Sequence, residues 1–128
     1  MSAATDLTAL AAEIEELFER ATSDLGEEAT ATVEEALSLL DDGSVRVASP
    51  GDAGWHVNEW AKKAILLSFR TRGMETIEVG PYEYHDKMPL KTNWAELGVR
   101  VVPPATVRQS AYVAPSAMLM PSYVNVGT

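Results

Sequence analysis

The chain contains no cysteine. It therefore cannot depend on disulfides, on a thiol nucleophile, or on a zinc or iron–sulfur site built from cysteine. No apolar run approaches the roughly 20 residues needed to span a bilayer, and no charged, apolar and small-residue signal pattern opens the sequence. We therefore expect a cytoplasmic protein without a membrane partner.

Basic residues are also scarce. Lysine and arginine total 10 against 19 aspartates and glutamates, which gives a formal net charge of −9. The excess lies in residues 1–44, with 12 acidic residues and one base (Arg20), whereas residues 45–128 hold 7 acidic and 9 basic residues. Because an acidic chain repels phosphate backbones, a nucleic-acid partner is not expected. The acidic residues alternate with apolar ones at helical spacing, which predicts solvated helix faces.

Apolar residues make up 46% of the 128 residues, enough for the core of one ordinary domain. Three stripes at helical spacing predict three helices. The stripes are Leu7, Leu10, Ile14, Leu17, Phe18 and Ala21; then Val33, Ala36, Leu37 and Leu40; then Val57, Trp60, Ala61, Ala64, Leu67 and Ser68. We expect Thr5 or Asp6 to cap the first helix, Gly26 to end it, and an antiparallel hairpin with the second.

The third stripe is the widest, because Ile65, Leu66 and Phe69 extend it. We therefore expect the third helix to be the most buried of the three. Around the helices we expect a short strand at 45–47, a loop at 49–54 and a strand at 74–79. Residues 80–98 are expected to be irregular, because prolines and glycines interrupt them.

Residues 101–128 fall into groups of six: VVPPAT, VRQSAY, VAPSAM, LMPSYV and NVGT. The first position holds Val101, Val107, Val113, Leu119 and then Asn125, and the fifth holds Ala105, Ala111, Ala117 and then Tyr123. An aliphatic residue followed four positions later by a small one, every six residues, indicates a parallel β-helix. The predicted fold class is therefore α+β, with a mainly helical domain at 1–98 and the first coil of a β-helix at 99–128.

Three groups of six complete one coil, so little more than one coil is present. A single coil buries little apolar surface, because each coil is covered by its neighbour. We therefore expect this sequence to be the truncated N-terminal part of a longer protein. Otherwise, we expect a partner chain to cover its last coil. The spacing alone does not give the handedness of the coil.

Four segments carry a family resemblance: WHVNEWAKKAILLSFR (55–70), DKMPLK (86–91), GVRVVPPATVR (98–108) and LMPSYVNVG (119–127). Together they resemble the tetrahydrodipicolinate N-succinyltransferase family of bacterial lysine and diaminopimelate synthesis. The resemblance implies a left-handed β-helix and a homotrimer with active sites between neighbouring β-helices. It also implies transfer of succinyl from succinyl-CoA, as co-substrate, to the amine of the ring-opened acceptor, a small dicarboxylate, with no tightly bound cofactor.

The resemblance also assigns residues. The arginine before Val-Val-Pro-Pro, which is Arg100 here, is a substrate-binding residue in the family. The acidic catalytic base and most of the CoA-binding surface lie past residue 128, so no catalytic residue is expected within this chain and the fragment alone should be inactive. No cofactor-binding residue is assigned, and residues 1–128 offer no convincing base, because an arginine cannot deprotonate an amine at neutral pH.

Arg100 also suits a dicarboxylate on chemical grounds, because a guanidinium fork matches a carboxylate bidentately. The alternative is a surface arginine at the entry to the coil. Arg108 is expected mainly at the solvated surface, and Lys87 and Lys91 are minor candidates for an anionic substrate. The remaining candidates are expected to have other roles: Trp55 and Trp60 in the core, Lys62 and Lys63 in solvent, His85 at the surface, and Ser110, Ser116 and Ser122 as products of the repeat. His56 and His85 lack ligand spacing, so no metal site is expected.

Two alternatives stay open at this point. The chain could be a non-catalytic module that forms trimers, or a hexapeptide acyltransferase with another acceptor. The sequence does not fix the acyl donor either.

Overall fold

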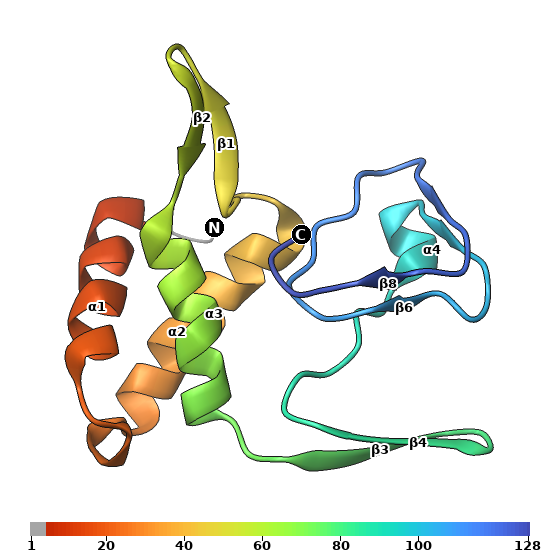
Figure 1. The fold of residues 1–128 in the computed structure, drawn as a ribbon, viewed down its shortest axis with the longest axis horizontal. Coiled ribbons are helices and arrows are strands. Elements are labelled where there is room, and N and C mark those ends of the chain that lie inside the picture. Colours follow the sequence, from red (N-terminus) through yellow and green to blue (C-terminus); the bar gives the residue numbers. More distant parts are fainter. Residues whose placement is uncertain (1–4) are drawn as a thin grey trace.

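Three helices pack together in the computed structural model, which describes residues 5–128 (Figure 1). They are α1 (Leu7–Glu19), α2 (Glu27–Asp42) and α3 (Glu59–Thr71). The predicted stripes supply most of the core, whose least exposed large side chains include Ile14, Val33, Leu37 and Leu67. No helix within residues 5–128 is both long and apolar enough to cross a membrane. Burial of these aliphatic faces is the main force that holds the helical part together.

The ends of α1 show where helical spacing is informative and where it is not. Asp6 caps the start as expected, since its carboxylate accepts hydrogen bonds from the backbone N–H groups of Thr8 and Ala9 at 3.0 and 3.2 Å. The helix ends at Glu19, so Ala21 lies outside it and the expectation that Gly26 ends it is wrong. Gly26 is instead the N-cap of α2, which follows a 3-10 turn at Thr22–Asp24.

A contact from α3 satisfies backbone carbonyls at the end of α1. The guanidinium of Arg70 donates to the backbone carbonyls of Phe18, at 3.1 Å, and of Arg20. These carbonyls lie at the end of the helix, where no N–H of the next turn reaches them. Arg70, which lies 50 positions after Arg20, therefore satisfies these carbonyls from outside the helix.

The third helix is not the most buried, contrary to the expectation. It buries Ala61, Ala64, Leu67 and Ser68, whereas α2 buries Ala29, Thr32, Val33, Ala36, Leu37 and Leu40. The second apolar face of α3 is only partly covered, and Leu66 keeps 44% of its surface exposed. The cover comes from the C-terminal segment, where Gly127 lies against Ile65 and Arg108 lies over Phe69.

Two antiparallel hairpins project from this body (Figure 1). The first joins β1 (Ala48–Gly51) to β2 (Gly54–Val57), where a strand at 45–47 and a loop at 49–54 were expected. Each hairpin has only two strands, so every strand is an edge strand. The edge position of β1 allows Pro50 there, because a proline has no backbone N–H to donate. Trp55 on β2 is 76% exposed, so its expected place in the core is wrong.

The second hairpin joins β3 (Glu75–Val79) to β4 (Tyr82–Asp86). The strand expected at 74–79 is confirmed, but the irregular segment expected at 80–98 contains β4 and the short helix α4 (Trp94–Leu97). The residues alternate between two faces. One face carries Ile77, Val79, Tyr82 and Tyr84, and the other carries Thr76, Glu78, Glu83 and His85.

The C-terminal segment folds back on itself in parallel pairs. β5 (Arg100–Val101) pairs with β7 (Met118–Leu119), and β6 (Thr106–Val107) pairs with β8 (Tyr123–Val124). Val101 lies opposite Leu119, as the groups of six require. Val107 lies opposite Val124, so the expected continuation at Asn125 is wrong and the repeat loses one residue after Leu119.

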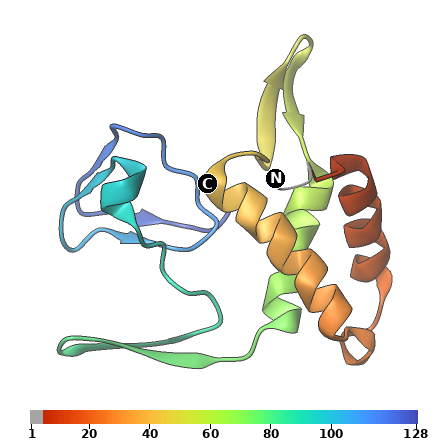
Figure 2. The ribbon, with the colours of Figure 1, turned by 180° about the vertical axis from the view of Figure 1, so that it is seen from behind.

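The C-terminal segment 99–128, called the coil below, also has corners that stack. Ser110 and Ser116 adopt left-handed backbone angles, with φ of 65° and 68°. The Ser116 N–H donates to the Gly98 carbonyl at 2.9 Å, and the Gly127 N–H donates to the Ser110 carbonyl at 2.8 Å. The two views agree that the chain ends beside the C-terminal end of α2 (Figures 1 and 2).

Candidate functional site

A buried ion pair joins the helical part to the coil. The ammonium of Lys91, whose side chain is 3% exposed, lies 2.9 Å from the Asp41 carboxylate and donates to the Asp41 backbone carbonyl at 2.8 Å. The same carboxylate accepts the backbone N–H of Ser110 at 2.6 Å. One aspartate at the end of α2 therefore fixes both the segment before the coil and a corner of the coil.

A second ion pair lies at the base of the β3–β4 hairpin. Arg108 donates to the Asp86 carboxylate at 2.5 Å and to the Asn125 amide oxygen at 3.2 Å, and its guanidinium lies over the Phe69 ring. Burial would raise the pKa of Asp86, but hydrogen bonds from Arg108 and from the Lys87 backbone hold that pKa below its ordinary value. The expectation of a solvated Arg108 is therefore wrong, because its guanidinium pairs with Asp86 and its side chain is only 18% exposed.

The two lysines that flank Pro89 are used in the same way. Lys91 is held by Asp41, and Lys87 donates to the Phe69 carbonyl at 2.7 Å. Neither ammonium is therefore free for an anionic substrate, contrary to the minor role considered for them. Arg72 completes this group, since it pairs with Glu34 at 2.6 Å and bonds Gln109 of the coil at 3.2 Å.

Arg100 differs from these cations. It lies on β5 in an exposed position, opposite Met118, and its backbone N–H donates to the Ala117 carbonyl at 3.1 Å. Among residues 5–128, its guanidinium makes no hydrogen bond, ion pair or stacking contact; of the basic residues described, Lys62 is the other cation without such a contact. The charge of Arg100 is therefore not paired with any group within residues 5–128.

The remaining candidates do not converge on one site. His56 and His85 lie on different hairpins, and the Nδ1 atom of His85 lies 3.2 Å from the Thr76 hydroxyl. In the described part of the chain no group of three possible metal ligands forms. Trp60 packs against the helical core as expected, and Ser110 and Ser116 occupy corners of the coil rather than a nucleophile set.

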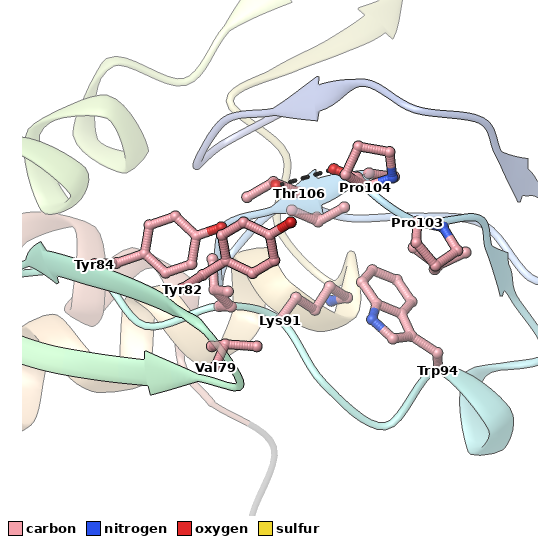
Figure 3. Close-up of a pocket in the computed structure, with 12 residues that line it drawn as sticks. Val79, Tyr82, Tyr84, Lys91, Trp94, Pro103, Pro104 and Thr106 are labelled. Atoms are coloured by element: carbon pink, nitrogen blue, oxygen red, sulfur yellow. Dashed lines mark hydrogen bonds between the residues drawn. The ribbon is translucent and has the colours of Figure 1, made fainter.

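A pocket of about 580 Å³ lies between the β3–β4 hairpin and the coil, and the sequence did not predict it. Figure 3 shows Tyr82 and Tyr84 on one side of it and Trp94 and Pro103 on the other, with Lys91 between them. Glu78 separates Ile77 from Val79, and Glu83 separates Tyr82 from Tyr84, and this alternation on each strand was a signal for an apolar hairpin face. The alternation did not predict which segment of the chain lies opposite that face.

Known proteins resemble this chain over most of its length. The sequence model described as "Tetrahydrodipicolinate N-succinyltransferase N-terminal" matches residues 9–71. Three relatives named 2,3,4,5-tetrahydropyridine-2,6-dicarboxylate N-succinyltransferase come from Shewanella sediminis (48% identical over 103 residues), Psychrobacter sp. (42% over 125) and Acinetobacter baylyi (50% over 101). The matches cover 76%, 89% and 74% of this chain but 38%, 46% and 37% of those relatives. The chain therefore spans less than half the length of these relatives, and it belongs to the tetrahydrodipicolinate N-succinyltransferase family.

Proposed function

We propose that this chain forms the N-terminal part of an N-succinyltransferase subunit. The enzyme transfers the succinyl group of succinyl-CoA to tetrahydrodipicolinate, in lysine and diaminopimelate biosynthesis in the cytoplasm. This proposal is supported by relatives that carry the name and are 42–50% identical to this chain. The matches cover 74–89% of the chain.

We propose that residues 99–128 are the first coil of a left-handed β-helix and that residues 1–98 form the domain before it. The parallel pairing of Val101 with Leu119 supports this, because three sides of six residues bring the chain back beside itself after 18 positions. The stacked left-handed corners at Ser110 and Gly127 support it as well. In this proposal three subunits assemble, and the active sites lie between neighbouring β-helices.

Arg100 is the proposed binding residue for a carboxylate of the acceptor. The observation that carries this assignment is the exposed guanidinium on β5, which has no partner in the described part of the chain, whereas its neighbours Arg108 and Lys91 are both held by carboxylates. A guanidinium binds a carboxylate through two parallel hydrogen bonds, which orients the acceptor as well as holding it.

In the proposed reaction the acceptor amine attacks the thioester carbonyl carbon of succinyl-CoA. The new C–N bond forms, the C–S bond breaks, CoA leaves as a thiolate, and the amine proton passes to a base. We propose that this base comes from outside residues 1–128, because the two histidines lie on separate hairpins, on β2 and β4, whereas Arg100 lies on β5. The role of this chain is then to position the acceptor.

The test is an Arg100→Ala variant of the enzyme that carries these residues as its N-terminal part. Loss of a charged hydrogen bond, worth roughly 1.5–3 kcal/mol, should lower kcat/KM for the acceptor by about 10- to 150-fold. The KM for succinyl-CoA should not change. Lys62→Ala is the matched control, because it removes the other cation without a contact among the described residues, on α3.

The kinetics separate the outcomes. Unchanged acceptor kinetics in Arg100→Ala would refute the role of Arg100 while leaving the family assignment intact. Enzyme that transfers succinyl to other amines but not to tetrahydrodipicolinate would refute the proposed acceptor. Release of CoA, followed with a thiol reagent, measures all of these rates.

A further inference from the structure

The side of the coil formed by β5 and β7 carries a cation among exposed apolar side chains. Arg100 lies directly opposite Met118 in the parallel pairing, so the two side chains emerge beside each other on one face of the pair. Val101 and Leu119 form the next pair and take the inward positions. Met120 follows Met118 by two positions and shares its outward face. Met118 and Met120 are 57% and 58% exposed, so this face combines one charge with two long apolar side chains.

The neighbouring side of the coil, formed by β6 and β8, has a different outward face. Thr106 lies opposite Tyr123 there. The residues two positions further on, Arg108 and Asn125, hydrogen-bond to each other at 3.2 Å, and Arg108 also pairs with Asp86. All four outward side chains of this side carry polar groups, and the cation among them is bonded within the protein. Of the two sides, only that of β5 and β7 therefore combines an unpaired cation with exposed methionines.

The combination matches one class of ligand. A guanidinium without an ion pair among residues 5–128, as Arg100 has, binds a carboxylate through two parallel hydrogen bonds. A methionine side chain is long, unbranched and adaptable, so it suits contact with a flexible carbon chain. An inorganic anion would use the arginine alone, and a neutral hydrocarbon would use the methionines alone. A carboxylate joined to a run of CH₂ groups uses both.

We propose that Met118 and Met120 form an apolar wall beside Arg100 that contacts the carbon chain of the bound carboxylate. The guanidinium holds the carboxylate, and the two thioether side chains lie along the CH₂ groups that follow it. This inference rests on the proposed role of Arg100 in binding the acceptor, and it adds two residues that select for the carbon chain. A carboxylate with too short a chain reaches the arginine but not the methionines, so it binds more weakly.

The test uses the purified full-length protein that carries these residues and two straight-chain probes, butanoate and hexanoate. The probes share the carboxylate and differ by two CH₂ groups, and titration at constant ionic strength gives both Kd values. A fully buried CH₂ strengthens binding about fourfold and a half-covered one about twofold, so hexanoate should bind about 4- to 16-fold more tightly than butanoate. Hexylammonium has the same chain with a cation at its end, so it should not bind beside Arg100.

Substitutions separate the two parts of the site. Replacing Met118 and Met120 together by alanine should bring the two Kd values to within about twofold of each other, because the wall is gone. Arg100→Ala should instead raise both Kd values by about tenfold or more and leave their ratio unchanged. Met74→Ala is the matched control, because Met74 is also exposed, at 49%, but directly precedes β3. It should change neither Kd value.

A carbon-13 label on the methionine methyl groups reports the contact directly. The NMR signals of Met118 and Met120 are assigned by their loss in the single alanine variants. Both signals should shift as hexanoate is added, and the signal of Met74 should not. Circular dichroism checks that the variants fold, which their exposed positions favour.

Three results would overturn the proposal: a double methionine variant that keeps the original ratio of Kd values, hexylammonium that binds as tightly as hexanoate, or methionine signals that do not respond to hexanoate. The last result is also the one expected when a second copy of the chain covers this face. Failure of the proposed function gives a different result. Arg100→Ala would then weaken hexanoate binding and leave the kinetics of succinyl transfer to the acceptor unchanged.

Discussion

Replacement of Asp41 by asparagine should destabilise the protein more than replacement of its partner Lys91 by methionine. The two side chains differ in exposure, at 34% for Asp41 and 3% for Lys91. In Asp41→Asn, the ammonium stays where water barely reaches it and loses its countercharge. Removing one partner of a buried ion pair in this way costs about 3–5 kcal/mol of unfolding free energy.

Substitution of the other partner leaves an unpaired group that is less costly. In Lys91→Met, the Asp41 carboxylate still accepts the Ser110 N–H at 2.6 Å, and its exposed third can be hydrated. The expected loss is about 1–3 kcal/mol, the ordinary range for a hydrogen-bonding group that loses its partner. The double variant should be more stable than Asp41→Asn alone, because it no longer contains an unpaired ammonium.

Urea unfolding followed by tryptophan fluorescence measures these differences. Glu16→Gln is the control, because the Glu16–Arg20 pair at the C-terminal end of α1 is exposed at 67% and 46% and should contribute less than about 0.5 kcal/mol. Equal effects of Asp41→Asn and Lys91→Met would refute the argument from exposure. A double variant as unstable as the sum of the single ones would show that the two residues do not interact.

Two further predictions concern acid stability and backbone conformation. The hydrogen bond from Arg108 keeps the pKa of Asp86 below its ordinary value of 3.8, so its contribution to stability is present above that pH and is lost as the pH falls through the folded pKa. Urea unfolding at a series of acidic pH values should show a shallower loss of stability in Asp86→Asn, and an unchanged slope would contradict this. Gly43→Ala should lower the unfolding free energy by more than 1 kcal/mol, because Gly43 has a φ of 82° and an added Cβ would lie 2.6 Å from the Tyr112 ring. Gly73→Ala, where an added Cβ meets nothing within 4 Å, should change it by less than about 0.5 kcal/mol.

The sequence by itself determined the helices and their buried faces. Ile14, Val33, Leu37 and Leu67 were all placed inward from spacing alone, and all are almost fully buried. Helical periodicity is a local property, because side chains three and four positions apart share a face whatever surrounds the helix. The repeat of six was visible for a similar reason. It failed only after Leu119, where the partner of Val107 is Val124 and not Asn125, so this part of the repeat is one residue shorter.

The tertiary structure alone decided which cations are free. Nothing in the sequence near Lys91 shows that Asp41, 50 positions earlier, neutralises it, or that Arg108 meets Asp86 across 22 positions. Arg100 lies on β5 and Arg108 directly follows β6, so the two arginines have similar places in the sequence pattern. Only the fold shows that Arg108 pairs with Asp86 and that Arg100 has no partner among the described residues. The same holds for the pocket, whose walls come from segments that meet only in the folded chain. Charge pairing and cavities depend on distances between remote residues, and those distances exist only once the helices, the hairpins and the coil have packed.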